Sequence, residues 1–195
     1  MRALMIYVMA GMGGFVIMSL ELLGGRILAP WFGNDIYVWG SIITIFMTAL
    51  ALGYLAGGRL SLDRPGLRRF AALFLAAATL LAPLLWYADT LLAWTFEHIE
   101  DLRYASLFAA TALFAPATFV LGTISPYSVR LLVDTTHRSG AVAGGLYFVS
   151  TLGSALGTLL TSFYFVLWFE INTIIAALAG VLAVLAVAGF AAGRR

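Results

Sequence analysis

An acidic and a basic side chain lie inside the first long apolar stretch of this sequence, where charges are rare. Glu21 and Arg26 follow a segment in which Arg2 is the only other charged residue. A charged group at membrane depth is costly, so it usually faces protein or water. Helical spacing places Glu21 on one stripe with Gly14 and Gly25, which lets another helix approach closely. We therefore expect Glu21 to point inward and Arg26, nearer the end of the stretch, to reach the interface.

Two interpretations of Glu21 stay open. In the first, its carboxylate binds a cationic or proton-carrying ligand. In the second, it ties helices together through Arg26, Tyr37 or backbone groups. Asp89 stands beside two aromatic residues near the end of a later apolar stretch, where it is either an interfacial carboxylate or part of the same ligand site.

Hydroxyl side chains recur in the second apolar stretch at spacings of three and four residues, which is typical of one helical face. Such a face either lines a polar surface or packs against a neighbouring helix. Together with the charged residues, these hydroxyls complete the candidate ligand-binding set: Glu21, Arg26, Tyr37, Ser41, Thr44, Thr48 and Asp89.

Residues for most other chemistry are missing from the sequence. There is no cysteine, and the two histidines both lie in polar stretches. Thiolate and haem ligation are thereby excluded, and we expect neither a metal nor a cofactor. The sequence contains no phosphate-binding loop and no Gly-x-Ser-x-Gly motif, so no catalytic residue is assigned.

The composition explains why the charges are so few. Of the 195 residues, 63% are hydrophobic and 10% are charged, whereas soluble domains are usually about 25% charged. This balance excludes a soluble globular protein and a nucleic-acid binder. The apolar stretches are too long, and alternate too little, to be strands. The sequence therefore predicts a single all-α membrane domain over residues 1–195, with six transmembrane helices at about residues 5–29, 37–57, 70–94, 104–129, 141–169 and 171–190.

The positions of the arginines predict the orientation. All the basic residues are arginines, and under six crossings nearly all of them fall on one side, which the positive-inside rule assigns to the cytoplasm. Both termini would then be cytoplasmic, in a multi-pass protein of the inner membrane. The N-terminal stretch is longer than a signal peptide, so we expect it to be retained. The arginines expected to face the cytoplasm, and there to contact lipid or a partner, are Arg59, Arg64, Arg68, Arg69, Arg130 and Arg138.

The expected helices divide into three and three around the polar segment 97–103, which suggests an inverted repeat. Three prolines interrupt apolar runs, at Pro83, Pro116 and Pro126, and each is a potential kink. Gly153 and Gly157 are spaced as in helix pairs whose backbones touch.

Several runs resemble the membrane portion of spermidine synthase-like membrane proteins. The runs that carry the resemblance are 21–34, 37–43, 53–60, 125–130, 144–147 and 150–160. In that family a cytoplasmic aminopropyltransferase-like domain commonly follows the helices. No such domain stands among these 195 residues, so the resemblance implies the membrane module alone, with Glu21 and Arg26 as its polar pair.

Two functions follow as expectations. The first is an anchor or scaffold, whose arginine loops dock a soluble synthase-like protein or a larger membrane complex. The second is a transporter or binding protein for a small cationic amine such as a polyamine, for which a homodimer would complete the transport unit. No nucleophile is placed beside a base, so an intramembrane enzyme is not favoured.

Overall fold

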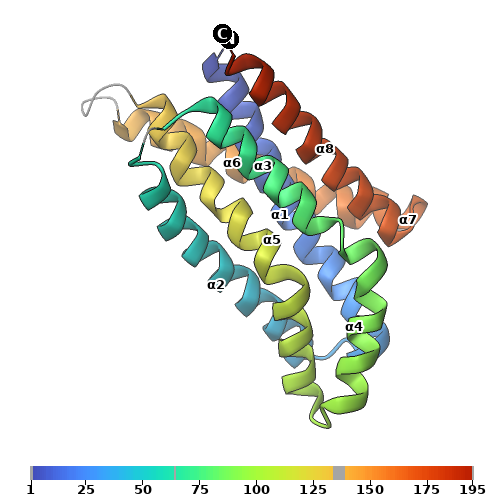
Figure 1. Ribbon diagram of the computed structural model, residues 1–195. Coiled ribbons are helices and arrows are strands. Elements are labelled where there is room, and N and C mark those ends of the chain that lie inside the picture. Colours follow the sequence, from blue (N-terminus) through green and yellow to red (C-terminus); the bar gives the residue numbers. More distant parts are fainter. Residues whose placement is uncertain (1, 64, 134–138, 195) are drawn as a thin grey trace.

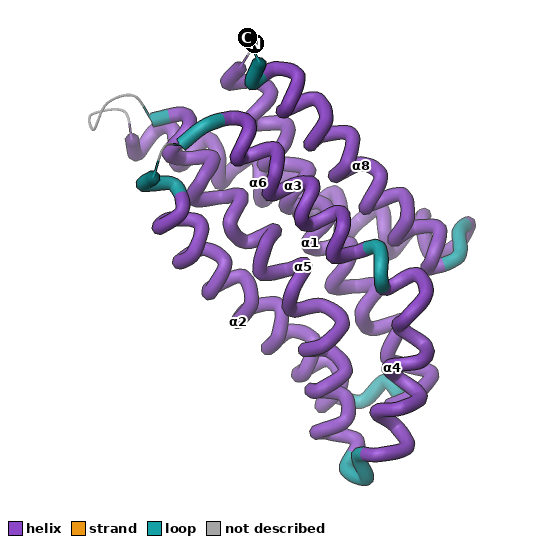
Figure 2. The backbone as a smooth tube through the Cα atoms, viewed as in Figure 1, coloured by secondary structure: helices purple, strands orange, loops and turns teal. Residues whose placement is uncertain are grey.

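The computed structural model describes residues 2–63, 65–133 and 139–194, and this part of the chain is helical with no strands (Figures 1 and 2). The long apolar runs form helices because each buries its own backbone hydrogen bonds and leaves an apolar surface. Their bounds are α1 Arg2–Phe32, α2 Ile36–Leu60, α3 Leu67–Leu81, α4 Leu84–His98, α5 Leu102–Leu132, α6 Ser139–Leu160, a π-helical turn Thr161–Phe165, α7 Val166–Trp168 and α8 Ile171–Ala192.

Five segments in the described chain have the length and apolar character of a membrane span: α1, α2, α5, the run from α6 through α7, and α8. The pair α3 and α4 passes the same test only when taken together, and the two helices meet at an angle of 50°. The number of helices that can cross a membrane is therefore five, or six if the bent pair is one span.

The third expected helix, 70–94, is wrong as a single element. The chain leaves the helix after Leu81 and resumes at Leu84, with Pro83 between them. Proline has no backbone N–H and its ring collides with the preceding turn, so a break is expected there. Pro116 and Pro126, by contrast, lie inside α5 without ending it. The fifth expected helix, 141–169, also changes its winding, since a π-helical turn interrupts it at Thr161.

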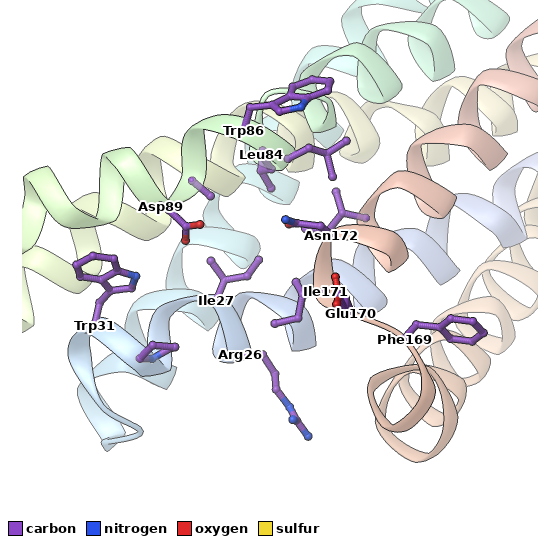
Figure 3. A pocket seen from close by; sticks show the side chains of 14 residues that line it. Arg26, Ile27, Trp31, Leu84, Trp86, Asp89, Phe169, Glu170, Ile171 and Asn172 are labelled. Carbon is purple, nitrogen blue, oxygen red and sulfur yellow. The ribbon is translucent and has the colours of Figure 1, made fainter.

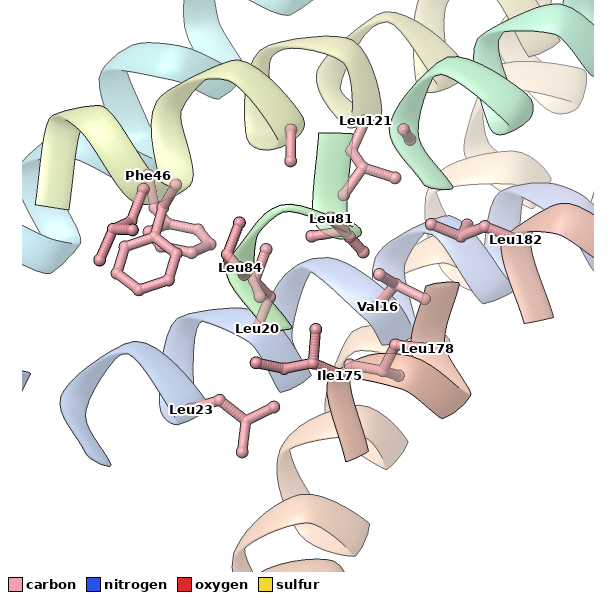
Figure 4. Packing of buried hydrophobic residues seen from close by; sticks show 14 of the residues in the cluster. Val16, Leu20, Leu23, Phe46, Leu81, Leu84, Leu121, Ile175, Leu178 and Leu182 are labelled. Carbon is pink, nitrogen blue, oxygen red and sulfur yellow. The ribbon is translucent and has the colours of Figure 1, made fainter. Parts of the chain in front are cut away.

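The helices pair across the two halves of the chain. α1 packs along α6, α2 packs along α5, and α3 packs along α8, while α1 and α5 also touch one another. Figure 4 shows the apolar side chains that fill the centre, which come from α1, α2, α3, α4, α5 and α8. The first helix of each half therefore packs on the second helix of the other half, and the third helices pair with each other.

Glycines bring both of the crossed pairs to backbone contact. In α2, a Cβ added to Gly57 would lie 2.5 Å from the carbonyl oxygen of Thr123 in α5. In α6, a Cβ added to Gly157 would lie 3.0 Å from the Cα of Phe15 in α1. Gly53 and Gly153, one turn earlier in each helix, meet Phe119 and Gly11 in the same way. The expected close backbone contact at Gly153 and Gly157 is thus confirmed, and Gly53 and Gly57 of α2 make the equivalent contact with α5.

The two termini lie at the same end of the bundle (Figure 1). Arg2, Arg68 and Arg69 line one cavity there together with Gly193, beside the last turn of α8. We call this the arginine-rich end, and the opposite end, with Asp35, Asp101 and Glu170, the acidic end. Arg64 and Arg138 lie outside the described residues.

Candidate ligand cavity at the acidic end

A cavity of about 470 Å³ opens at the acidic end between α1, α4 and the start of α8 (Figure 3). We call it the acidic cavity, because two of the side chains that line it are carboxylates, Asp89 in α4 and Glu170 at the N-cap of α8. Its lining residues are Arg26, Ile27, Pro30, Trp31, Leu84, Leu85, Trp86, Ala88, Asp89, Phe169, Glu170, Ile171, Asn172 and Ile175.

Two local features of the backbone create this cavity. The break at Pro83 turns α4 away from the line of α3, so its first two turns form one wall and carry Asp89. The second feature is the extended conformation of Glu170 (φ −67°, ψ 150°), which ends one helix and starts α8. Glu170 therefore reaches the cavity from the N-cap of α8, and Asn172 from its first turn.

The polar groups of the cavity favour a cation. Within the described residues, the carboxylates of Asp89 and Glu170 have no hydrogen bond and no ion pair of their own. Figure 3 shows Asp89 and Asn172 directed into the cavity from opposite walls, whereas the guanidinium of Arg26 extends away from it. The indole rings of Trp31 and Trp86 also line the cavity, and such rings attract cations.

Glu21 and Arg26 do not form a pair. They are five positions apart in the sequence, which places their side chains about 140° apart around the helix. Glu21 is half-buried and, in the described chain, has no hydrogen bond or ion pair, whereas Arg26 is exposed. The hydroxyl of Tyr37 donates to the carbonyl oxygen of Phe32 at 3.0 Å. The structure therefore contains neither of the two side-chain ties that would give Glu21 a purely structural role.

The hydroxyls expected to share one face of the second helix are divided. Ser41 is buried, donates to the carbonyl oxygen of Tyr37 at 2.8 Å and lies 3.2 Å from the hydroxyl of Ser106 in α5. Thr44 and Thr48 are exposed on the outer surface of α2. None of these three hydroxyls lines the acidic cavity. Ser41 therefore joins α2 to α5, because its hydroxyl finds its hydrogen-bond partners, Tyr37 and Ser106, within the bundle.

Glu170, Asn172 and Trp86 are cavity residues that the sequence did not single out. One signal was present: Glu170 and Asn172 are the polar residues at the junction of the last two apolar stretches. A charged side chain at so short a junction lies close to the ends of both helices.

A second cavity, of about 510 Å³, lies at the arginine-rich end. It is lined by Arg2, Gly66, Leu67, Arg68, Arg69, Ala192 and Gly193. Arg69 is 3.5 Å from a carboxylate oxygen of Asp63 and also donates to the Asp63 carbonyl oxygen. Arg59 and Arg130 are exposed, and the hydroxyl of Tyr127 accepts a hydrogen bond from the Gly66 N–H at 3.1 Å. This surface is strongly basic, and the hydrogen bond to the buried Tyr127 fixes the position of Gly66 within it.

The described residues contain no group of three or more metal-ligating side chains. Comparisons of the chain with protein families, with curated proteins and with solved structures gave no match. The function is therefore argued from the residues and their geometry.

Proposed function

We propose that this chain is a multi-pass membrane protein with six crossings and both termini in the cytoplasm, in which α3 and α4 together form the third crossing. α8 is about 33 Å long at 1.5 Å per residue, enough to cross a hydrocarbon core of about 30 Å. Met9 of α1 lies against Gly189 of α8, and Arg26 of α1 and Asn172 of α8 line the same cavity. Arg26 would then mark the outer edge of the hydrocarbon, and Glu21 would lie about 7 Å below it.

The pairing of helices supports an inverted repeat, with α1 to α4 as one half and α5 to α8 as the other. Gly57 of α2 contacts Thr123 of α5, and Gly157 of α6 contacts Phe15 of α1. When the two halves are exchanged, the first of these contacts corresponds to the second. The contact of Gly14 with Ser150 corresponds in the same way to the contact of Gly122 with Leu50, because the equivalent helices are offset in sequence by the same amounts. The inner membrane is the location that the arginine-rich end favours.

Within this arrangement the chain binds a small cationic amine in the acidic cavity. The observation that carries this proposal is that two unpartnered carboxylates, Asp89 and Glu170, line one cavity together with two indole rings at the edge of the apolar band. An ammonium group has three donors for the carboxylate oxygens and a charge that the rings attract. The resemblance to spermidine synthase-like membrane proteins supports an amine as the ligand class.

The test is calorimetric titration of putrescine and ethanolamine into the purified protein in phosphatidylglycerol nanodiscs. Each hydrogen bond to a charged group is worth about 1.5–3 kcal/mol, so Asp89→Asn and Glu170→Gln should each raise Kd about tenfold or more. Glu100→Gln, an exposed acid at the same end outside the cavity, is the matched control and should leave Kd unchanged. Equal binding by the Asp89→Asn/Glu170→Gln double variant would refute the site.

A second function is favoured by a different observation, the basic surface at the arginine-rich end. Arg2, Arg68 and Arg69 share a cavity there, and Arg59 and Arg130 are exposed. Such a surface can anchor a soluble synthase-like protein or a larger membrane complex. A stoichiometric partner that co-purifies with the chain in mild detergent, and is lost in Arg68→Gln/Arg69→Gln, would support the anchor role, whereas purification of the chain alone would count against it.

A further inference from the structure

A separate cavity of about 190 Å³ lies where the last turns of α1 meet the start of α2 and the π-helical turn. Its polar lining residues are Arg26, Asn34, Trp39, Thr161 and Ser162. Among the described residues, no carboxylate lines it. We call it the donor cavity, because its polar side chains offer N–H and O–H groups without an acid to receive them.

Arg26 is an exception to the charge distribution of the chain. In the described residues, Arg26 and Arg103 are the arginines of the acidic end, whereas the other arginines lie at the opposite end. Arg103 lies 2.6 Å from a carboxylate oxygen of Asp101, but Arg26 has no ion pair and no hydrogen bond within the described chain. Figure 3 shows its guanidinium directed away from the acidic cavity, and Arg26 also lines the donor cavity. Its five N–H groups are therefore available to an anion.

The side chain of Asn34 presents N–H groups, and one contact fixes this orientation. Nε1 of Trp39 lies 3.0 Å from Oδ1 of Asn34. Because an indole N–H can only donate, the amide oxygen is the acceptor and the amide NH₂ keeps both of its donors. Gly25 makes the contact possible, since a Cβ there would lie 2.6 Å from Cη2 of the Trp39 ring.

The π-helical turn forms another wall of the donor cavity and is tied to α1 by hydroxyl groups. Thr161 is fully buried and donates to the hydroxyl of Ser19 at 2.9 Å. Ser19 in turn donates to the carbonyl oxygen of Gly157 at 3.4 Å. Ser162 follows directly and lines the cavity, and in the part of the chain that the structure describes its hydroxyl has no partner. Single π-helical turns inside α-helices occur frequently at functional sites.

From this set of donors we infer that the donor cavity binds a phosphate group. The guanidinium of Arg26 supplies a positive charge and a fork of N–H groups that matches two phosphate oxygens. Asn34 and Ser162 stand on two other segments, so they would donate to the remaining oxygens. A carboxylate has only two oxygens in one plane, so a tetrahedral group makes fuller use of donors from three segments.

The inference does not depend on amine binding in the acidic cavity. Only the location of the donor cavity, at the outer edge of the hydrocarbon, rests on the orientation proposed above. At that depth a phosphate group is supplied either by a phospholipid headgroup or by a soluble phosphate ester, and both present the same oxygens.

The experiment is calorimetric titration of the purified full chain in an uncharged detergent. The probes are inorganic phosphate, glycerol 3-phosphate, dihexanoyl phosphatidic acid and, as a planar anion, acetate. We expect the phosphate probes to bind and acetate to bind at least tenfold more weakly. A Kd for phosphatidic acid at least tenfold below that of glycerol 3-phosphate would identify a lipid as the source, and equal Kd values would identify a soluble phosphate.

Two variants and a matched control test the donors. Arg26→Gln removes the charge, and Asn34→Asp keeps an acceptor for Trp39 but replaces the amide NH₂ with a negative oxygen. Each should raise the Kd of the phosphate probes by about tenfold or more. Arg103→Gln removes the same charge at the same end but outside the donor cavity, and it should leave Kd unchanged.

The outcomes that would overturn the inference are specific. They are the absence of binding by every phosphate probe, equal binding of acetate and phosphate, or an unchanged Kd in Arg26→Gln and Asn34→Asp. The Asp89→Asn/Glu170→Gln variant, which removes the amine site, should change the phosphate Kd by less than about fivefold, because exposed charges interact weakly. A gain of tenfold or more in that variant would show that Arg26 serves those carboxylates instead, and the assignment would be wrong.

Discussion

Replacing Gly57 with alanine tests the helix contact on which the whole arrangement depends. The new Cβ would lie 2.5 Å from the carbonyl oxygen of Thr123, 2.6 Å from the Thr123 Cα and 2.9 Å from the Cγ of Pro126. Two of these three atoms are backbone of α5, so no side-chain rotation relieves the collision. Since carbon atoms pack at about 3.5–4.0 Å, α2 and α5 would have to separate by about 1 Å.

The neighbouring glycine supplies the control. No atom lies within 4 Å of a Cβ added to Gly58, which is in the same helix. Both substitutions gain the same helix propensity, about 1 kcal/mol, so their difference isolates the steric cost. Overpacking costs about 1–3 kcal/mol, and we expect Gly57→Ala to be less stable than Gly58→Ala by that amount.

The assay is reversible unfolding in mixed micelles, titrated with a denaturing detergent and followed by circular dichroism and tryptophan fluorescence. Gly157→Ala against Gly144→Ala repeats the comparison in α6, where Gly157 meets the backbone of Phe15 and Gly144 meets nothing within 4 Å. Equal stabilities within either pair would show that the backbones are not in contact there, and the proposed repeat would lose its main support.

Two further predictions concern charged side chains. Glu21→Gln should insert and fold normally but reduce amine uptake by whole cells at least tenfold if Glu21 carries a cation or a proton, and unchanged uptake would remove Glu21 from the ligand path. Arg103 donates to the Asp101 carboxylate from its backbone N–H and its guanidinium, which lowers the pKa of Asp101 to about 2. Because this folded-state pKa lies below the unfolded value of about 3.9, the stabilisation of the α5 N-terminus is present above pH 4 and is lost as the pH falls toward 2. Asp101→Asn should therefore flatten the pH dependence of stability between pH 4 and pH 2, and an unchanged profile would contradict the assignment.

The apolar runs predicted the helices well, because the length of a membrane-type helix is determined by the length of the local apolar run. Five of the six expected segments correspond to one continuous run each, although the run through Thr161 contains a π-helical turn. The break at Pro83 was also foreseeable, since a proline removes its hydrogen bond wherever the rest of the fold lies. Pro116 and Pro126 show the limit of the rule, because packing on both sides keeps α5 continuous around them.

The site was harder to predict, because it depends on the direction of side chains and on distant packing. The five-residue separation of Glu21 and Arg26 already places them on different faces, yet proximity in sequence made them look like a pair. Ser41 faces Ser106, a partner 65 residues away, while Thr44 and Thr48 face outward. No local pattern distinguishes a hydroxyl that meets a partner helix from one that does not.

The acidic cavity owes its existence to a difference between the two halves. At the arginine-rich end α3 and α8 stay in contact, with Gly189 against Ala71 and Gly193 against Arg68. At the other end α8 begins at Ile171, whereas α4 has already turned by 50° at Pro83. If α8 is the counterpart of α3 and α4 in an inverted repeat, the bend is what breaks the symmetry, and it opens a space beside Asp89 and Glu170 at the acidic end. The feature that could bind a ligand is thus the place where the two halves cease to match.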